Sequence, residues 1–354
     1  MKVVKSHVID LTNASNGYCG WSTIGKDLNN NLSIVFSGSR LFHVCPFGKL
    51  EIIQSSDKGQ TWTWPRVIYD GPADDRDAGW CVTQNGSILV SSFSSFDFKN
   101  YKKFYLEKNL LNHENLKKWE WAERNSLFYE FKGNGNWMFR STDHGISWNG
   151  PYSAIVNSAH GPIQLENGRL LHAGRATYID KGKPAICYSD DDGVTWEILS
   201  FIPARDNDNP SKYYELHIAE TEPNKILCHI RNENDESKGH ILQCHSEDGG
   251  KNWSVPQDIG FYGSPPHLLK TQMGYLVLSY GYRKPPYGNL CRISHDSGLN
   301  WSDPILISDD GDCTDLGYPS SVEIDTNTFI TVWYQKNQSD KFAKLRQLQW
   351  HLEF

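Results

Sequence analysis

Near residue 55 the chain reads Ser55-Ser56-Asp57-Lys58-Gly59-Gln60-Thr61-Trp62, and the pattern Ser-x-Asp-x-Gly-x-x-Trp in this stretch occurs five times. The other four copies begin at Ser141, Ser189, Ser246 and Ser294. Each copy lies between two short runs of β-forming residues, which is the position of a hairpin turn. The Ser and Asp oxygens can accept hydrogen bonds from the turn, the Gly can adopt a positive φ, and the Trp can pack over the hairpin. Such a repeat predicts a propeller, a solenoid or another array.

The segments between the copies predict four strands per repeat. The third repeat has alternating runs at 160–165 and 169–174, a turn at 166–168, and a third run at 185–188 that leads into the pattern. The fourth and fifth repeats keep this order. Four antiparallel strands per repeat are typical of a propeller blade. We therefore predict an all-β fold, a six-bladed β-propeller.

The sixth blade and the second blade depart from the common pattern. The sixth begins near Asp315, has no copy of the pattern, and is expected to be completed by the N-terminal run 3–9, which closes the ring. The second blade has an insertion at about 96–136, whose segments 105–111 and 116–120 are helix-like. This insertion could form a lid or a rim. No domain boundary is evident, so residues 1–354 are expected to be one propeller domain.

Composition excludes several classes of function. Aromatic residues make up 13% of the chain, with 13 Trp, and supply a large apolar area for a core. The net charge of −7 and the lack of a basic run make nucleic acid an unexpected partner. The eight Cys are scattered singly, which favours reduced, buried thiols over a zinc site or disulfides. No membrane span or signal-peptide core is present, so a cytoplasmic location is expected unless a leader was removed.

The repeated pattern, the blade order and the ring closure resemble those of the sialidase (neuraminidase) superfamily of six-bladed propellers. In that family the pattern lies at the outer edge of the blades. The resemblance therefore implies a structural role for its Asp residues and places the chemistry on the propeller axis.

Three segments resemble parts of the sialidase active site. Glu215 precedes Arg231 by 16 residues, as a Glu precedes the second arginine of the family's carboxylate-binding triad. Tyr318 lies in Gly317-Tyr318-Pro319-Ser320, where the family has its Tyr nucleophile. Arg283 precedes the fifth copy of the pattern and matches the third arginine best.

These residue types suit an acidic sugar. A carboxylate nucleophile would be repelled by a carboxylate at the anomeric centre, whereas a neutral Tyr would not. The ordinary Tyr pKa near 10 requires a nearby base, which the resemblance assigns to Glu215. The planar, paired donors of arginine match a carboxylate in a way that Lys cannot.

The chain also departs from the family. The place of the first arginine reads Cys19-Gly20-Trp21-Ser22-Thr23-Ile24, and the loop at 37–48, where the family has its acid/base Asp, contains no acid. Several nearby residues are candidate replacements. His43 or Asp77 could supply the proton, and Arg76 or Arg40 could bind the anion. Further candidate contacts to the substrate in the channel are His160, His267 and Arg175.

The resemblance implies an exo-acting glycoside hydrolase that acts on a terminal acidic sugar: sialic acid, a related nonulosonate or a uronate. Tyr318 would attack the anomeric carbon, Glu215 would activate it, and His43 or Asp77 would protonate the leaving oxygen. No metal or organic cofactor is implied. Two alternatives stay open: a polysaccharide lyase, in which a Tyr or His abstracts the proton α to a uronate carboxylate, and a glycan-binding propeller without turnover.

Overall fold

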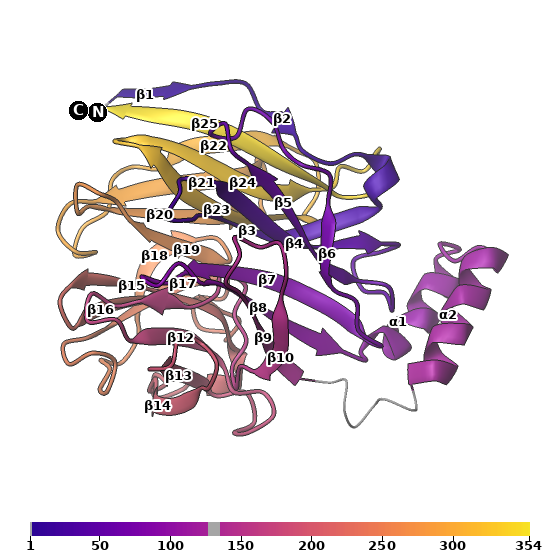
Figure 1. The fold of residues 1–354 in the computed structure, drawn as a ribbon, viewed down its shortest axis with the longest axis horizontal. Coiled ribbons are helices and arrows are strands. Elements are labelled where there is room, and N and C mark those ends of the chain that lie inside the picture. Colours follow the sequence, from indigo (N-terminus) through magenta and orange to yellow (C-terminus); the bar gives the residue numbers. More distant parts are fainter. Residues whose placement is uncertain (1, 127–134) are drawn as a thin grey trace.

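The computed structural model describes residues 2–126 and 135–354 and consists mainly of six antiparallel sheets (Figure 1). In five of the six sheets the strands pair in chain order as a simple meander, and in the sixth the N-terminal strand is added beside the C-terminal one. The first three sheets contain the following strands: β3 (Tyr18–Lys26), β4 (Leu32–Arg40), β5 (Lys49–Ser55) and β6 (Arg66–Tyr69); β7 (Asp74–Val82), β8 (Ile88–Ser95), β9 (Gly135–Ser141) and β10 (Asn149–Ser153); β11 (Ile163–Gln164), β12 (Leu170–Arg175), β13 (Pro184–Ser189) and β14 (Glu197–Phe201).

The other three sheets complete the ring. They contain β15 (Tyr213–Glu222), β16 (Lys225–Asn232), β17 (His240–Ser246) and β18 (Gln257–Tyr262); β19 (Pro266–Lys270), β20 (Leu276–Tyr282), β21 (Tyr287–Ser294) and β22 (Ile305–Gly311); β23 (Leu316–Asp325), β24 (Thr328–Gln335), β25 (Lys344–Glu353) and β1 (Lys2–Lys5). Short 3₁₀ turns lie at Ala14–Asn16 and Pro210–Lys212. The first strands of neighbouring sheets contact one another from β15 through β19, β23, β3 and β7 to β11, so these strands line the axis.

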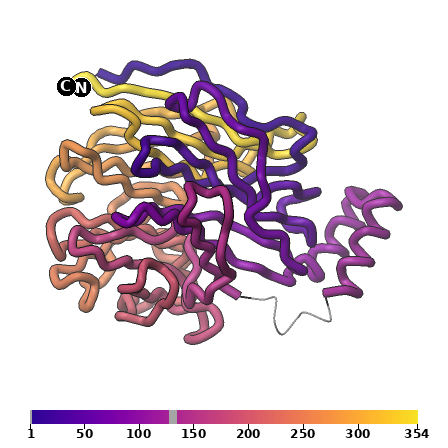
Figure 2. Tube along the Cα trace, in the orientation of Figure 1, coloured from indigo at the N-terminus to yellow at the C-terminus, as the bar shows by residue number. Residues whose placement is uncertain are grey.

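The fold confirms the predicted six-bladed propeller and its closure. Strand β1 pairs antiparallel with β25, and β2 (Ile9–Asp10) pairs with the same strand farther along. The two ends of the chain therefore share one sheet, and Figure 2 shows them side by side. Because the last blade combines both ends, the ring is held closed by a complete ladder of backbone hydrogen bonds.

The repeated pattern forms turns that join neighbouring blades. In the first copy, the Ser55 hydroxyl accepts from the Gly59 amide (2.9 Å), and Asp57 accepts from the backbone and side chain of Thr61. These hydrogen bonds, the one from the Thr61 hydroxyl first, lower the pKa of Asp57 to about 2. Gly59 has φ +80°, and a Cβ there would lie 2.6 Å from Ile330 of the sixth blade. The glycine is therefore required by both its φ and its contact.

The other four copies repeat this packing. Their glycines lie against an aliphatic side chain of the preceding blade, namely Ile52, Leu89, Leu171 and Leu227 in turn. Each pattern thus fixes one blade to the previous one. This arrangement accounts for the repetition without any catalytic role.

The insertion forms two helices, α1 (Phe98–Glu107) and α2 (His113–Ser126), which stand beside the propeller in Figure 1. Helix α2 contains the predicted segment 116–120, whereas α1 begins before the predicted segment 105–111 and ends at Glu107, so residues 108–111 are not helical. The predicted insertion also includes 127–134, which lie outside the described residues. Tyr105 and Trp119 form an apolar cluster with the loop at 41–47. The Tyr105 hydroxyl accepts from the Val44 amide (3.2 Å). The helices therefore support the loop that carries His43.

Two further sequence predictions concern cysteines and membranes. All eight Cys are free, and all except Cys313 are buried, as predicted. In the described part of the chain, no helix is long and apolar enough to cross a membrane.

Candidate active site

Four of the strands that line the axis share one local distortion. Trp21 in β3, Asp77 in β7, Glu215 in β15 and Tyr318 in β23 have φ values of 54°, 48°, 45° and 53°. The pairing of each strand with its neighbour shifts register at that point. Non-glycine residues rarely adopt positive φ, and such strained positions concentrate at functional sites. Because these strands run the same way along the axis, the four side chains lie at a common level.

At this level Tyr318, Glu215 and Arg231 form a connected chain of polar contacts. The Tyr318 hydroxyl donates a hydrogen bond to Oε1 of Glu215. Nη1 of Arg231 lies 2.8 Å from Oε2 of Glu215, and its Nη2 lies 2.7 Å from Glu233. Arg231 thus bridges two carboxylates, one of which accepts the hydrogen bond of the Tyr318 phenol.

The protonation states of this pair follow from burial and charge. Burial raises the pKa of Tyr318 well above 10, so the phenol is neutral at physiological pH. Burial alone would also raise the pKa of Glu215. The Arg231 guanidinium and the Tyr318 hydrogen bond outweigh burial and hold the pKa of Glu215 below its ordinary value. A neutral phenol therefore faces an ionised carboxylate, which is the arrangement of a nucleophile and its base.

Arg283 lies against the same tyrosine. Its guanidinium carbon is 5.7 Å from the centre of the Tyr318 ring, and its Nε donates to the Leu316 carbonyl (2.9 Å). Among the described residues, Arg283 has no acidic partner within ion-pair distance. Its remaining N–H groups are available to an external anion.

Trp21 stands where the resemblance leads one to expect an arginine. The Trp21 and Tyr318 rings are perpendicular, with centroids 6.5 Å apart, and the guanidinium carbon of Arg76 lies 4.3 Å from the centre of the Trp21 ring. Arg76 also donates to the His43 carbonyl (3.0 Å) and lies 3.4 Å from Asp74. At the position of the expected arginine, the chain therefore has an aromatic ring, and the cation nearby is the Arg76 guanidinium on the face of that ring.

The prediction that Arg40 reaches a bound anion is wrong. Its side chain is fully buried and forms an ion pair of 2.6 Å with Asp74, which is also fully buried. The guanidinium also donates to the Ser37 hydroxyl and to the His43 carbonyl. Arg40 therefore holds the loop that carries His43 against the second blade, and no ligand can reach it.

The two candidate proton donors lie in different surroundings. Asp77 lines a cavity of about 240 Å³ together with Glu215 and Arg175, and burial raises the pKa of Asp77 to about 7. Nδ1 of His43 lies 3.0 Å from Asp315 and 3.0 Å from the Tyr18 hydroxyl. His43 is 46% exposed, contacts Trp21 and does not line that cavity. Asp77 thus has a pKa near neutral and lines the same cavity as Glu215, as a general acid beside Glu215 would.

Arg175 is also in this cavity. Its guanidinium stacks on Tyr214 (4.1 Å), and its Nε is buried without a hydrogen-bond partner. The Arg175 guanidinium is therefore held against Tyr214 in this cavity, and its Nε–H group has no acceptor.

His160 and His267 do not lie in this cavity. Both are buried and line a different cavity farther along the axis, with His217. The ring centroids of His160 and Tyr318 are 6.4 Å apart, but His160 lines this second cavity and Tyr318 does not. The prediction that the two histidines contact the substrate beside Tyr318 is not supported by their placement.

Sequence reasoning missed three residues of the site: Trp21 as a wall, Glu233 as the second partner of Arg231, and Asp315 as the partner of His43. Of these three, only Trp21 could have been found from the sequence, because it lies in the segment where the resemblance predicts an arginine. The other two depend on contacts between segments, such as the 272 residues between His43 and Asp315.

Comparison with known proteins agrees with this architecture. Residues 111–331 match the family described as BNR repeat-like domain. A protein of unknown function from Dyadobacter fermentans DSM 18053 has a similar structure, with a TM-score of 0.77, 24% identity, and 99% of each chain covered. Among curated proteins, no relative matches the chain in sequence.

Two sialidases have the same fold. The NanB sialidase of Streptococcus pneumoniae superposes with a TM-score of 0.68 at 14% identity, over 98% of this chain and 70% of the other. The intramolecular trans-sialidase of Ruminococcus gnavus gives 0.64 at 13% identity, over 97% and 96% of the two chains. At these identities the likeness establishes a common fold.

Proposed function

The chain belongs to the family of BNR repeat-like domains, with the propeller fold of sialidases, and we propose that it is an exo-acting glycoside hydrolase that releases a terminal acidic sugar. The observation that carries this proposal is the hydrogen bond from the Tyr318 phenol to Glu215, whose other oxygen is paired with Arg231. A purely structural role would not require three strained, polar positions at one level of the axis.

In the first step, the Tyr318 oxygen attacks the anomeric carbon while its proton passes to Glu215. The bond from that carbon to the leaving oxygen breaks, and Asp77 gives its proton to the leaving oxygen. The products of this step are a sugar linked to Tyr318 and the free alcohol.

In the second step, water attacks the same carbon. The Asp77 carboxylate takes the proton from the water, the bond to Tyr318 breaks, and the phenolate recovers its proton from Glu215. Two displacements at one carbon give retention of configuration, which NMR of the first-formed product tests.

The charges of the site favour an acidic sugar. Arg283 has N–H groups without an acidic partner, and Arg76 presents a second guanidinium on the face of Trp21. Arginines bind carboxylates with paired, planar hydrogen bonds. A neutral nucleophile avoids repulsion with such a substrate. We therefore propose sialic acid, a related nonulosonate or a uronate as the sugar, with Arg175 contacting a ring substituent.

A screen of aryl glycosides tests this function. The panel contains 4-methylumbelliferyl glycosides of sialic acid, another nonulosonate, glucuronic acid and galacturonic acid, with neutral glucoside and galactoside as controls. Wild type is expected to release the fluorophore from an acidic member only, and Tyr318→Phe to lose this activity. Undiminished activity in Tyr318→Phe would defeat the mechanism. An ultraviolet-absorbing unsaturated product from a uronate polysaccharide would identify a lyase instead.

A further inference from the structure

A second cavity opens at the other end of the axis. Its volume is about 530 Å³, and it is lined by Lys26, Val82, Lys270 and Glu323, which lie at or near the ends of β3, β7, β19 and β23. The site around Tyr318 lies near the beginnings of the same set of strands. The two sites therefore face opposite sides of the propeller, and the proposed hydrolysis does not use the second one.

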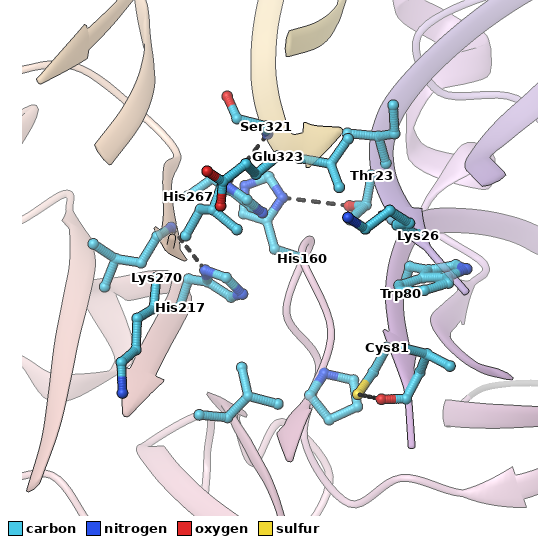
Figure 3. A pocket seen from close by; sticks show the side chains of 18 of the residues that line it. Thr23, Lys26, Trp80, Cys81, His160, His217, His267, Lys270, Ser321 and Glu323 are labelled. Carbon is cyan, nitrogen blue, oxygen red and sulfur yellow. Dashed lines mark hydrogen bonds between the residues drawn. The ribbon is translucent and has the colours of Figure 1, made fainter. Parts of the chain in front are cut away.

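Three histidines form the inner end of this cavity. His160, His217 and His267 are buried, with ring centroids 4.7 to 5.4 Å apart, and His217 stacks on His267. Figure 3 shows the rings on one side of the cavity, with Trp80 and Cys81 across from them. In the described part of the chain, no group of His, Cys, Asp and Glu side chains is suited to a metal ion, and this trio is no exception.

Backbone hydrogen bonds fix the tautomers of two of these rings. The Leu268 amide donates to Nδ1 of His217 (2.9 Å), and the Ser321 amide donates to Nδ1 of His267 (3.4 Å). Burial lowers the pKa of both rings well below 6.5, so each is neutral and carries its single proton on Nε2. Two N–H donors thus remain at the inner end of the cavity.

Neither donor has a partner within the protein. The Nε2 atoms of His217 and His267 form no hydrogen bond with any described residue, and they are not among the atoms sealed from solvent. His160 differs, because its Nδ1 faces the Thr23 hydroxyl (3.4 Å) and its Nε2 is sealed. The cavity therefore contains two unmatched donors on neighbouring, stacked rings.

Lys26 brings a cation into the lining of this cavity. Figure 3 shows the Lys26 side chain extending toward the histidine rings, whereas Lys270 extends away. Within the described ranges Lys26 has no ion pair and no side-chain hydrogen bond, whereas Lys270 lies 3.4 Å from Glu166. The carboxylate of Glu323 accepts hydrogen bonds from the backbone amides of Gln272 and Asn327. These bonds keep the Glu323 carboxylate at the two turns.

Much of the remaining lining is apolar. Ile24, Trp80, Ile163, Leu268 and Val322 line the cavity. An apolar cavity of several hundred Å³ with a few convergent polar groups is the usual form of a small-molecule site. Thr23, Gln164, Thr271 and Ser321 also line the cavity, but their side chains form hydrogen bonds within the protein. The polar groups that remain for a ligand include the two imidazole donors and the Lys26 ammonium, which match an anion.

We propose that this cavity binds a small organic anion, a monocarboxylate with an aromatic or branched aliphatic body. The carboxylate accepts hydrogen bonds from Nε2 of His217 and His267 and from the Lys26 ammonium. The body packs against Trp80, Leu268 and Val322. This site is independent of the proposed hydrolysis.

Phenylacetate is a suitable probe, with phenylacetamide as its uncharged counterpart. Binding to the full chain is followed by saturation-transfer NMR and isothermal titration. Phenylacetate is expected to bind, and the amide to bind at least about tenfold more weakly, because charge-assisted hydrogen bonds are lost. Lys26→Met should weaken phenylacetate binding by about tenfold, whereas Lys270→Met should change it by less than about twofold.

A third variant separates this site from the catalytic one. Arg283→Met removes the free guanidinium beside Tyr318 and should leave phenylacetate binding unchanged. The proposal is overturned if phenylacetate does not bind, or if the amide binds equally well. It is also overturned if Arg283→Met abolishes binding while Lys26→Met does not.

Discussion

The Tyr318 hydroxyl donates its hydrogen bond to Glu215, although 103 residues separate the two. Each residue lies at a positive φ where an axial strand shifts register against its neighbour. The strained backbone turns both side chains toward the axis at one level, and neighbouring blades hold the strain in place. The proposed chemistry therefore depends on the closed ring rather than on any single segment.

Glu215→Gln should reduce kcat by about a hundredfold to ten-thousandfold, because the amide cannot accept the phenol proton. The matched control is Glu233→Gln, since Glu233 is the other carboxylate on Arg231. It should reduce kcat much less, because it does not contact Tyr318. Steady-state kinetics on the best aryl glycoside compares the two. Equal losses would mean that Glu215 only positions Arg231.

Asp77 should set the alkaline limb of the activity. A general acid must be protonated, and burial raises the pKa of Asp77 to about 7, so kcat/KM should fall as the pH rises above about 7. Activity should also fall at low pH, where Glu215 becomes protonated and can no longer act as the base. Because the pKa of Glu215 is held below that of an ordinary Glu, this fall should occur at a lower pH than for an ordinary Glu. Asp77→Asn should abolish the alkaline limb.

The leaving group provides an independent check on Asp77. Asp77→Asn should impair an alkyl glycoside far more than a 4-nitrophenyl glycoside, since a good leaving group needs little protonation. A His43→Gln variant is the control, because His43 does not line the cavity of Asp77. If His43→Gln instead removes the alkaline limb, His43 is the proton donor.

Arg283→Met should lower kcat/KM for the acidic glycoside by about tenfold to a hundredfold, the range expected for a lost charge-assisted hydrogen bond. The corresponding glycoside carboxamide, a poor substrate of the wild type, should be almost unaffected. Kinetics on this pair measures the coupling between the guanidinium and the carboxylate. Equal losses on both compounds would show that Arg283 supports the fold rather than the anion.

Trp196→Ala in the third copy of the repeated pattern should lower stability by about 3–5 kcal/mol, the usual cost of removing a buried Trp side chain. Trp196 is 7% exposed, and its Nε1 donates to the Gly193 carbonyl (3.1 Å). Urea unfolding measures the change. At a temperature where the variant stays folded, kcat/KM should be unchanged, because the pattern joins blades and does not reach the axis.

Much of the fold was predictable because its repeated unit contains its own turn chemistry. The residues of Ser55–Trp62 hydrogen-bond among themselves, so the sequence reports them directly. The order of segments along the chain was enough to place Tyr318, Glu215 and Arg231 in one cluster. Ring closure was predictable because the N-terminal run of strand residues had no place in the other blades and was therefore assigned to the sixth.

The rest depended on contacts between blades. Arg40 looks like a free loop cation in the sequence, but Asp74 of the next blade encloses it. His160 and His267 precede or begin inner strands, like the predicted site residues, yet a shift of two or three positions along an axial strand moves a side chain to the next level. The axial strands β3, β7, β15 and β23 shift register at their site residues, whereas β11 and β19 pair without a shift, and the order of residues in the sequence does not distinguish the two cases.

Trapping of the covalent intermediate tests the central claim most directly. A glycosyl fluoride of the preferred acidic sugar, with a second fluorine beside the anomeric carbon, slows breakdown of the sugar–enzyme bond. Intact-protein mass spectrometry and peptide mapping then locate the adduct. The account predicts one sugar per chain on Tyr318, and no adduct in Tyr318→Phe. An adduct on another residue, or turnover of this compound with inversion, would contradict it.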